Sequence, residues 1–286
     1  MRARAPASSA NLGPGFDALA IALALHVTVE VTKADELTVT AEGQGSDLPA
    51  DAEHLAARVA TAVAGHDRLA IRVHSDIPVG RGLGSSAALA VAAAVAAGAG
   101  DALERGSAAD GHPENAAAST LGGLVTAATI GGRPVVRRLP LDPALRFVAV
   151  VPERELRTAE ARAALAPTVT RADAVFNVGR LGLLIAGLAD HRQLVAEAFE
   201  DRLHQAARTR LYPEAASLIE GLVGAGALGA CWSGAGPTLL AVCTAETVER
   251  LMEAATGLLA GHGVVGSVLC LPPDMEGVTV EDGPGR

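Results

Sequence analysis

The sequence has almost no lysine: of its 23 basic residues only Lys33 is lysine, and the others are arginine. Lys33 stands between two strand-like segments, beside Asp35 and Glu36, which is typical of a solvated turn residue. A mechanism that needs a lysine on the phosphates of a nucleotide, or a lysine Schiff base, therefore has no good candidate in this chain.

Other scarcities exclude classes of partner. Aromatic residues make up 2% of the chain, the net charge is −9 and there is no basic stripe, which argues against nucleic acid and anionic membranes. The N-terminus lacks a signal-peptide pattern, and the longest apolar run, residues 87–100, is too short to span a bilayer. Cys231, Cys243 and Cys270 are far apart, as expected of reduced thiols. We expect a cytoplasmic protein without nucleic acid or membrane partners.

What is present predicts an α+β fold in two halves. Alternating apolar residues predict strands at 27–31, 37–41, 69–75, 124–130 and 146–151, and short apolar runs predict three more near 228–233, 238–243 and 263–270. Helical spacing predicts helices from Asp51 to residue 65 and over 85–98, 158–165, 171–189, 191–203, 214–224 and from about 245. We expect domains at 1–150 and 151–286, with a loose tail in the last ten residues.

A glycine-rich stretch, GRGLGSSAA at residues 80–88, opens the longest apolar run. Its three glycines leave backbone N–H groups free to approach an anion, and Ser85 or Ser86 can cap a helix whose dipole favours negative charge. The phosphate-loop pattern G-x-x-x-x-G-K-S/T is absent, because no lysine follows. The stretch predicts a phosphate site made of backbone amides, and a tight turn into a core helix fits equally well.

The stretch PASSANLGPGFDALA, residues 6–20, predicts a rigid turn that carries the amide of Asn11 and the carboxylate of Asp17. These groups suit a small substrate with hydroxyl or ammonium groups. On its own, a Gly-Pro turn with Asp17 as a helix cap is the simpler interpretation.

Two more stretches place polar or small residues together. GHPENAAASTLGG, residues 111–123, crowds His112, Glu114 and Asn115, although a histidine there is more often a cap or a core residue. SGAGPT, residues 233–238, is a small-residue loop between two strands, whose backbone either faces the first glycine loop or forms a plain hairpin turn.

Together and in this order, the four stretches resemble the motifs of the GHMP kinases, small-molecule kinases named for galactose, homoserine, mevalonate and phosphomevalonate. The resemblance spans residues 2 to about 243 and is nearest to the homoserine kinases, whose pattern RTAEAR (157–162) and DRLHQAAR (201–208) also follow. It implies an N-terminal half like ribosomal protein S5 domain 2 and a ferredoxin-like C-terminal half. The implied activity is ATP-dependent phosphorylation of L-homoserine to O-phospho-L-homoserine, for threonine biosynthesis.

The resemblance also implies the residues of the site. ATP and Mg²⁺ are held at the glycine loop without a lysine, and Glu104 stands eight residues before the GHP histidine, where the family has its second metal contact. The implied ATP contacts are Pro78, Val79, Gly80, Arg81, Gly82, Leu83, Gly84, Ser85, Ser86, Ala87 and Ala88, with His54 near the adenine. The implied catalytic residues are Ser86, Glu104 and Asn115, of which Ser86 and Glu104 contact the metal. The implied homoserine contacts are Asn11, Asp17, His112, Asn115, Thr158, Arg162 and Arg208.

Three departures from the family pattern stand out. The segment between Ser86 and His112 is shorter than usual, Glu114 stands where aspartate is commoner, and His54 replaces a usual asparagine. Glu114 is only a candidate base, so catalysis is expected to rest on positioning and charge neutralisation. Two alternatives stay open: a GHMP kinase acting on another small alcohol, and a kinase-like sensor that binds ATP and ligand without turnover. A homodimer is also left open.

Overall fold

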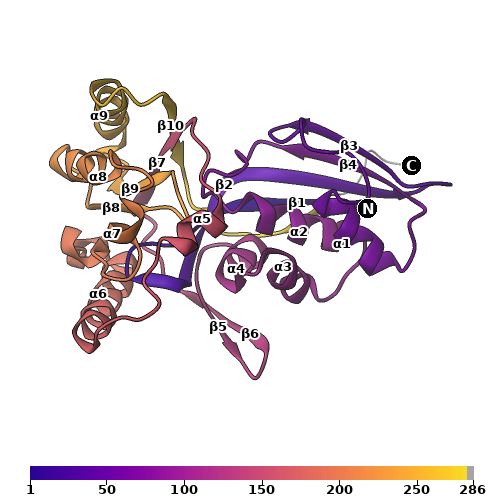
Figure 1. Cartoon of the computed structure of the whole chain (residues 1–286), viewed down its shortest axis with the longest axis horizontal. Coiled ribbons are helices and arrows are strands. Elements are labelled where there is room, and N and C mark those ends of the chain that lie inside the picture. The colour runs from indigo at the N-terminus through magenta and orange to yellow at the C-terminus, as the bar shows by residue number, and fades with distance from the viewer. Residues whose placement is uncertain (282–286) are drawn as a thin grey trace.

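The computed structural model describes residues 1–281 and contains two β-sheets, the second at one end of the first (Figure 1). The first sheet has the strand order β11-β1-β2-β4-β3, and β5 pairs with β2 and with β6. Among its strand pairs only β3 and β4 are parallel. Its strands are β1 (Arg2–Asn11), β2 (Gly15–Lys33), β3 (Thr38–Gly43), β4 (Leu69–Ser75), β5 (Leu124–Ile130), β6 (Arg133–Leu139) and β11 (Thr279–Glu281).

Four helices cover one face of the first sheet (Figure 1). They are α1 (Leu55–Ala64), α2 (Ser85–Ala96), α3 (Ala102–Asp110) and α4 (Pro113–Leu121). Helix α2 is buried on nearly every side, and its many alanines let its neighbours approach closely. A Cβ on Gly106 of α3 would lie 2.6 Å from Val91 Cγ2, so this helix contact depends on glycine. The glycine loop therefore leads into a helix fixed at the centre of the N-terminal half.

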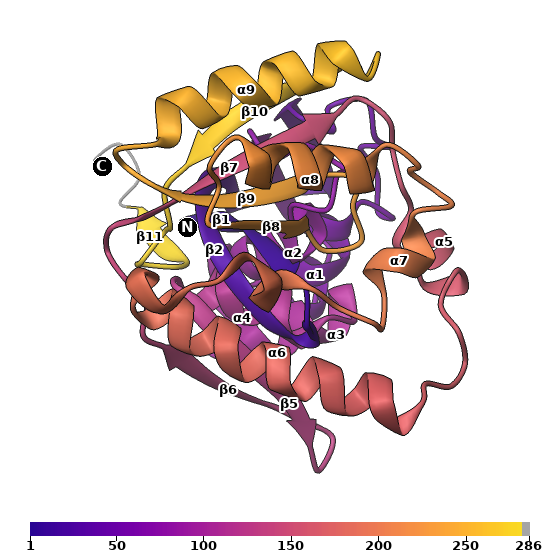
Figure 2. The ribbon, with the colours of Figure 1, turned by 90° about the vertical axis from the view of Figure 1, so that its left-hand side faces the viewer.

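The second sheet is antiparallel, with the order β10-β7-β9-β8 and helices α8 and α9 on its outer face (Figure 2). Its core includes Tyr212, Leu218, Trp232 and Leu251, all buried. The elements are β7 (Leu145–Pro152), β8 (Gly229–Trp232), β9 (Leu239–Thr244), β10 (Gly266–Leu271), α8 (Ala215–Gly224) and α9 (Val248–Gly261). The predicted α+β fold in two halves is confirmed.

The remaining helices are α5 (Thr158–Ala163), α6 (Arg171–Ala189) and α7 (Gln205–Arg208). The prediction of a helix over 191–203 is wrong: the chain forms two short 3₁₀ turns, His191–Gln193 and Ala196–Phe199. Its apolar spacing instead serves packing, because Leu194 lies against Gly187 of α6. Helix α1 begins at Leu55 with His54 as its N-cap, whereas Asp51, the predicted start, caps a turn through Glu53 N.

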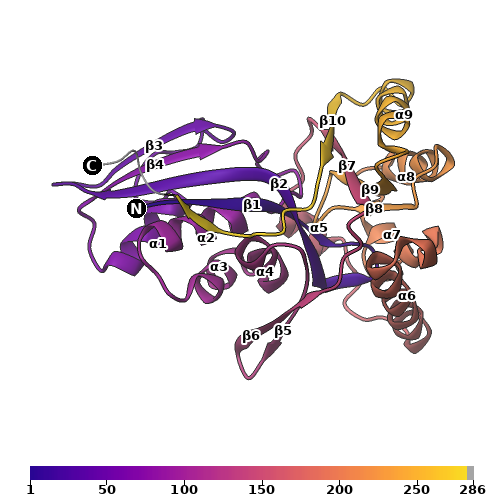
Figure 3. The same ribbon diagram turned by 180° about the vertical axis from the view of Figure 1, so that it is seen from behind.

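After β10 the chain returns to the first sheet (Figure 3). Asp274 accepts a hydrogen bond from His26 Nε2 at 2.8 Å, and β11 pairs with β1. The predicted loose tail is therefore wrong for residues 279–281, and its last five residues lie outside the described part of the chain. The second sheet already begins at Leu145, in β7. The division into domains 1–150 and 151–286 stays a prediction.

Candidate active site

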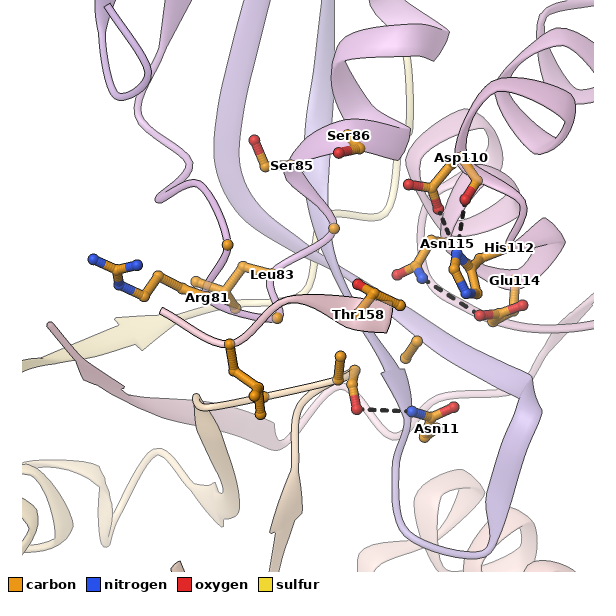
Figure 4. A pocket seen from close by; sticks show the side chains of 18 of the residues that line it. Asn11, Arg81, Leu83, Ser85, Ser86, Asp110, His112, Glu114, Asn115 and Thr158 are labelled. Atoms are coloured by element: carbon orange, nitrogen blue, oxygen red, sulfur yellow. Dashed lines mark hydrogen bonds and ion pairs between the residues drawn. The ribbon is translucent and has the colours of Figure 1, made fainter. Parts of the chain in front are cut away.

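Segments from both halves of the chain surround a cavity of about 110 Å³ (Figure 4). The N-terminal half contributes the turn between β1 and β2, the glycine loop and the start of α4. The C-terminal half contributes α5, α7 and the loop after β8. The predicted site residues that line this cavity are Asn11, Asp17, Pro78, Gly80, Arg81, Gly82, Leu83, Gly84, Ser85, Ser86, His112, Asn115, Thr158, Arg162 and Arg208.

The glycine loop ends in an exposed helix N-terminus. Gly84 is the N-cap of α2, with φ 65°, and no side chain caps this end, so the prediction of a serine cap is wrong. The Ser85 and Ser86 side chains are instead directed to the cavity. The backbone N–H groups of the first turn have no acceptor within their own helix, and the helix dipole adds a partial positive charge there. This end of α2 suits an anion such as a phosphate.

The glycines of this loop are needed by the protein's own packing. A Cβ on Gly82 would collide with the carbonyl oxygen of Ser233, and one on Gly84 would collide with the hydroxyl of Ser8. Ser233 Oγ lies 2.7 Å from Gly82 O, so the loop after β8 does face the glycine loop. The sequence interpretation explained glycine at 82 and 84 by the close approach of a ligand. Packing against Ser233 and Ser8 is a second reason for glycine at these positions.

A second cavity, of about 250 Å³, adjoins the first and shares Ser85 and Ser86 with it. Its wall is mostly apolar and includes Val79 and His54 of the predicted ATP contacts. His54 Nδ1 accepts a hydrogen bond from Ala56 N, and burial lowers the pKa of His54, which keeps the ring neutral. The cavity suits a flat, mostly apolar ring system.

Three predicted residues line neither cavity. Ala87 and Ala88 are fully buried in α2. Glu104 is exposed on the first turn of α3, and its predicted contact with the metal stays a prediction. The connection between α2 and α3 spans only residues 97–101.

The turn between β1 and β2 holds an amide and a carboxylate in strained backbone positions. Asn11 and Asp17 both have positive φ, 73° and 54°, and Asn11 Oδ1 accepts a hydrogen bond from Asp17 N at 3.0 Å. Asn11 Nδ2 donates to Gly234 O at 2.9 Å. The Asp17 carboxylate forms a two-pronged ion pair with Arg162 of α5, at 2.7 and 3.0 Å. Asp17 therefore acts as the anion of the site.

Arg208 of α7 is the buried cation of the site, with 2% of its surface exposed. Its Nη1 donates to Gly234 O at 2.7 Å and to His204 Nδ1 at 3.1 Å, and its buried Nε has no partner. Within residues 1–281 no carboxylate forms an ion pair with it. Burial lowers the pKa of Arg208 to about 10, so it stays charged at neutral pH. Such a cation needs an anionic ligand.

The start of α4 forms a wall of ionisable groups (Figure 4). His112 Nδ1 donates to the Asp110 backbone oxygen at 2.9 Å, and its hydrogen bond with the Asp110 side chain raises the pKa of His112. Glu114 is 1% exposed, and burial raises the pKa of its carboxyl group to about 7. Asn115 Nδ2 donates to Glu114 Oε1 at 3.4 Å.

Sequence reasoning missed the residues that position this site. Asp201 accepts the backbone N–H groups of Leu203, His204 and Gln205, and so fixes the start of α7. His204 Nε2 donates to Gly13 O at 2.8 Å while its Nδ1 accepts from Arg208, and burial holds the pKa of His204 well below its usual value. An aspartate before a helical run is a recognisable capping signal, whereas the DRLHQAAR stretch includes His204 without indicating its role.

Comparison with known proteins agrees with this geometry. Residues 52–123 match the model of the GHMP kinase N-terminal domain, and residues 179–259 match that of the GHMP kinase C-terminal domain. A homoserine kinase from Desulfitobacterium hafniense is 34% identical, with 98% of this chain and 99% of that protein aligned. One from Solibacter usitatus is 40% identical over 91% of this chain and 90% of that protein.

Solved structures extend the comparison to the fold. A homoserine kinase from Cytophaga hutchinsonii has a TM-score of 0.85 and 26% identity, covering 98% of this chain and 96% of that one. Mevalonate kinase from L. major, at 13% identity and a TM-score of 0.70, shares the fold. Two domain models together cover more than half of the chain, which places it among the GHMP kinases. Within that superfamily, the chain belongs to the homoserine kinase family.

Proposed function

We propose that the protein transfers the γ-phosphoryl group of ATP to the side-chain hydroxyl of L-homoserine, giving O-phospho-L-homoserine and ADP for threonine biosynthesis. The observation that carries this proposal is that one cavity beside the N-terminus of α2 contains both the anion Asp17 and a buried cation, Arg208, that forms no ion pair with a carboxylate of residues 1–281. A free amino acid offers a carboxylate to the first and an ammonium group to the second. The phosphate donor approaches along α2.

The donor would lie across both cavities. Its base fits the apolar cavity that contains Val79 and His54, and its phosphates fit the loop from Gly80 to Ser86. Backbone N–H groups and the helix dipole take the place of the missing lysine. Arg81 is less available than its position suggests, because its Nη1 lies 3.3 Å from Glu155 Oε1. Positioning and charge neutralisation are then the main sources of catalysis.

Magnesium is proposed to accompany ATP. The Ser86 hydroxyl faces the cavity and fits a hard cation that keeps phosphate oxygens and waters as its other ligands. Glu104, which the resemblance implies as a second metal contact, is exposed and lines neither cavity, so Ser86 is the ligand that the cavity favours. When bound, the ion neutralises charge on the phosphate oxygens.

We also propose a homodimer that pairs through α6, in a cytoplasmic protein without nucleic acid or membrane partners. Helix α6 is the one helix of the described residues long and apolar enough to cross a membrane, yet Asn177, Leu184 and Leu188 on one face are buried in the protein. On the opposite face Val175 and Val178 are 66% and 73% exposed. An exposed apolar face of this kind is typical of a surface that binds another protein.

The exposed face is self-complementary, which favours a second copy as the partner. Among its exposed positions, a row with the spacing 3, 4, 3, 4, 3 consists of Ala172, Val175, Gly179, Gly182, Ala186 and Ala189, and Val178 lies beside Val175 and Gly182 on the helix surface. An antiparallel copy brings Gly179 opposite Gly182, where no atom of the chain lies near a potential Cβ. Arg171 lies at the first residue of α6, where the helix dipole is positive and disfavours a cation. The antiparallel arrangement places this side chain beside the C-terminus of the other α6, where the dipole is negative and favours it.

The function is tested by ADP release in the presence of homoserine, mevalonate, shikimate or pantoate. We expect turnover with homoserine alone. Turnover with another alcohol would identify a different GHMP kinase. Binding of ATP and homoserine by calorimetry, without release of ADP, would identify a sensor instead.

A further inference from the structure

His54 uses one ring nitrogen to cap helix α1 and leaves the other for the apolar cavity of about 250 Å³. Its Nδ1 accepts a hydrogen bond from Ala56 N at 3.3 Å, so the single proton of the neutral ring is on Nε2. Burial lowers the pKa of His54, which makes the neutral ring the form present at neutral pH. The residue is 7% exposed and lines this cavity, and Nε2 has no hydrogen-bond partner among residues 1–281. This buried N–H therefore calls for an acceptor from a ligand.

Other polar side chains line the same cavity, and they belong to Gln44, Glu53, Ser75, Ser85 and Ser86. Ser85 and Ser86 also line the first cavity, where the phosphates are proposed to bind. Ser75 Oγ already accepts a hydrogen bond from Ile77 N at 3.2 Å. Gln44 and Glu53 are exposed, so water competes for their side chains. Nε2 of His54 is therefore the buried polar atom whose role beside the base is fixed by the protein.

Position 6 of a purine decides which bases a single donor can serve. Adenine has the acceptor N7 beside a 6-amino donor, whereas a purine with an oxygen at C6 has two acceptors, N7 and O6. The asparagine that His54 replaces in the family pattern offers one donor and one acceptor, which together match adenine alone. Neutral His54, with Nδ1 occupied by Ala56 N, offers only the donor. This donor can pair with N7 of either base or with O6, so it does not select the amino group.

We propose that the cavity accepts purine nucleoside triphosphates with an oxygen at C6, such as ITP, as phosphate donors alongside ATP, because His54 offers the base only a donor. The inference rests on the proposed function and adds a second class of phosphate donor to it. ITP would react in the way proposed for ATP. The substrate hydroxyl oxygen forms a bond to the γ-phosphorus, the bond from that phosphorus to the β,γ-bridging oxygen breaks with its electron pair on IDP, and the hydroxyl proton passes to solvent.

The main rival is that Gln44 or Glu53 selects the amino group in place of His54. Either side chain can accept a hydrogen bond from the 6-amino group of adenine, and both line the cavity. The two interpretations differ in what the wild type does. Selection by Gln44 or Glu53 predicts a clear preference for ATP, whereas a site that depends on the His54 donor treats ATP and ITP nearly alike.

The test measures kcat/KM for ATP and for ITP at saturating homoserine, with phosphorus NMR of the phosphorylated product as the readout. This readout avoids coupling enzymes that have nucleotide preferences of their own. We expect the wild-type value for ITP to lie within about threefold of that for ATP, because a lone donor serves both bases. His54→Asn and His54→Gln add an acceptor beside the donor and should raise the ratio of ATP to ITP by about tenfold, mainly through KM.

His66→Asn is the matched control. Nδ1 of His66 accepts a hydrogen bond from Arg68 N at 3.2 Å, as Nδ1 of His54 does from Ala56 N, but His66 is exposed and lines neither cavity. This variant should keep the wild-type ratio of ATP to ITP. Circular dichroism shows whether each variant is folded.

The inference fails if the wild type prefers ATP by more than about tenfold, which is the discrimination expected of a matched donor and acceptor pair. It also fails if neither His54→Asn nor His54→Gln changes the ratio by more than about threefold. Calorimetric dissociation constants for ADP and IDP give the same comparison without turnover. A chain that phosphorylates another alcohol, or none, would therefore contradict the proposed function and still test the role of His54.

Discussion

At the scale of single residues, the site depends on three buried ionisable groups, each with a specific reason for its charge. Arg208 stays cationic although buried, His204 stays neutral because burial disfavours its protonation, and Glu114 changes its charge near neutral pH. The neutral form of His204 is needed, since its Nδ1 accepts from Arg208 while Nε2 donates to Gly13 O. Through these two hydrogen bonds, neutral His204 joins the turn between β1 and β2 to Arg208 of α7.

Arg208→Lys should lower kcat/KM for homoserine tenfold or more. Lysine keeps the charge but loses the planar fork that reaches Gly234 O, His204 and a carboxylate together. A charge-assisted pair in a closed site is worth a few kcal/mol, so a tenfold loss is a low estimate. Steady-state kinetics with Arg157→Lys, an exposed arginine on the same side of the site, gives the control.

3-Aminopropanol makes this test specific for the carboxylate. It lacks that group, so it should be a poor substrate for the wild type and nearly insensitive to Arg208→Ala or Arg162→Ala. Equal losses for both substrates would assign the two arginines to ATP or to the fold.

Glu114→Gln should raise stability at high pH. The folded pKa of Glu114 is raised from 4.5 to about 7, so its favourable contribution is complete below pH 4.5 and is lost as the pH rises through about 7. Above that pH the buried carboxylate costs up to about 3 kcal/mol relative to the neutral group that glutamine imitates. Urea unfolding at pH 8.5 and at pH 4.5 measures this. A variant that is less stable at both pH values would show that the carboxylate is favourable where it lies.

At the scale of elements, the segment that leads into α5 joins the two parts of the site. Leu156 N donates to Gly80 O at 3.2 Å, and the Arg81 side chain lies near Glu155, so the segment touches the glycine loop. One turn later Thr158 and Arg162 line the substrate side of the cavity. This short segment therefore connects the glycine loop with the substrate side of the cavity.

The relation between α2 and α3 decides the metal contact. Ser86→Ala should raise the magnesium concentration needed for half-maximal activity several-fold, because the ion keeps few protein ligands. Glu104→Gln should leave that requirement unchanged, since Glu104 is exposed and lines neither cavity. Magnesium titrations of both variants at saturating ATP provide the measurement. A raised requirement in Glu104→Gln would mean that α3 turns toward the nucleotide when it binds.

At the scale of the whole molecule, the chain uses both of its ends to build one unit. The last described residues return from the second sheet, and β11 pairs with β1. The hydrogen bond between His26 and Asp274 holds the returning segment against β2. The active site lies between the two sheets, and neither half contains both the phosphate loop and Arg208. Truncation after β10 would therefore affect the first sheet as well as the second.

The dimer is tested with Val178→Lys. Val178 is 73% exposed, so the change should leave the folded chain intact and place a charge in the proposed α6 contact. Light scattering from about 1 to about 100 µM should show the wild type moving from one chain to two, because a single pair of helices makes a small interface. Val178→Lys should stay at the 28.7 kDa of one chain.

The control is Val265→Lys, at a position that is 66% exposed outside α6. It should dimerise like the wild type. A wild type that remains a single chain throughout, or that sediments with phospholipid vesicles through α6, would contradict the proposed pairing.

The sequence by itself determined the features that depend on local patterns. Most of the strands, the buried alanine-rich helix α2 and α6 follow from the spacing of apolar residues, and the full length of α6, residues 171–189, was predicted. Strands β1, β6, β11 and the first part of β2 were not predicted. The motif order identified the kinase family, and the nearly complete absence of lysine indicated phosphate binding by backbone amides. These conclusions need no knowledge of which segments meet.

Only the tertiary structure decided what depends on distant contacts. Glycine at 84 is required by Ser8, and the availability of Arg208 as a cation follows from its having no ion pair with a carboxylate among residues 1–281, which no local pattern records. Glu104 matches its motif by counting residues, but the short connection before α3 leaves it exposed. The burial that raises the pKa of Glu114 comes from packing of α4 in the folded chain. Spacing along a chain fixes periodicity, whereas burial and charge pairing arise only when the segments have packed together.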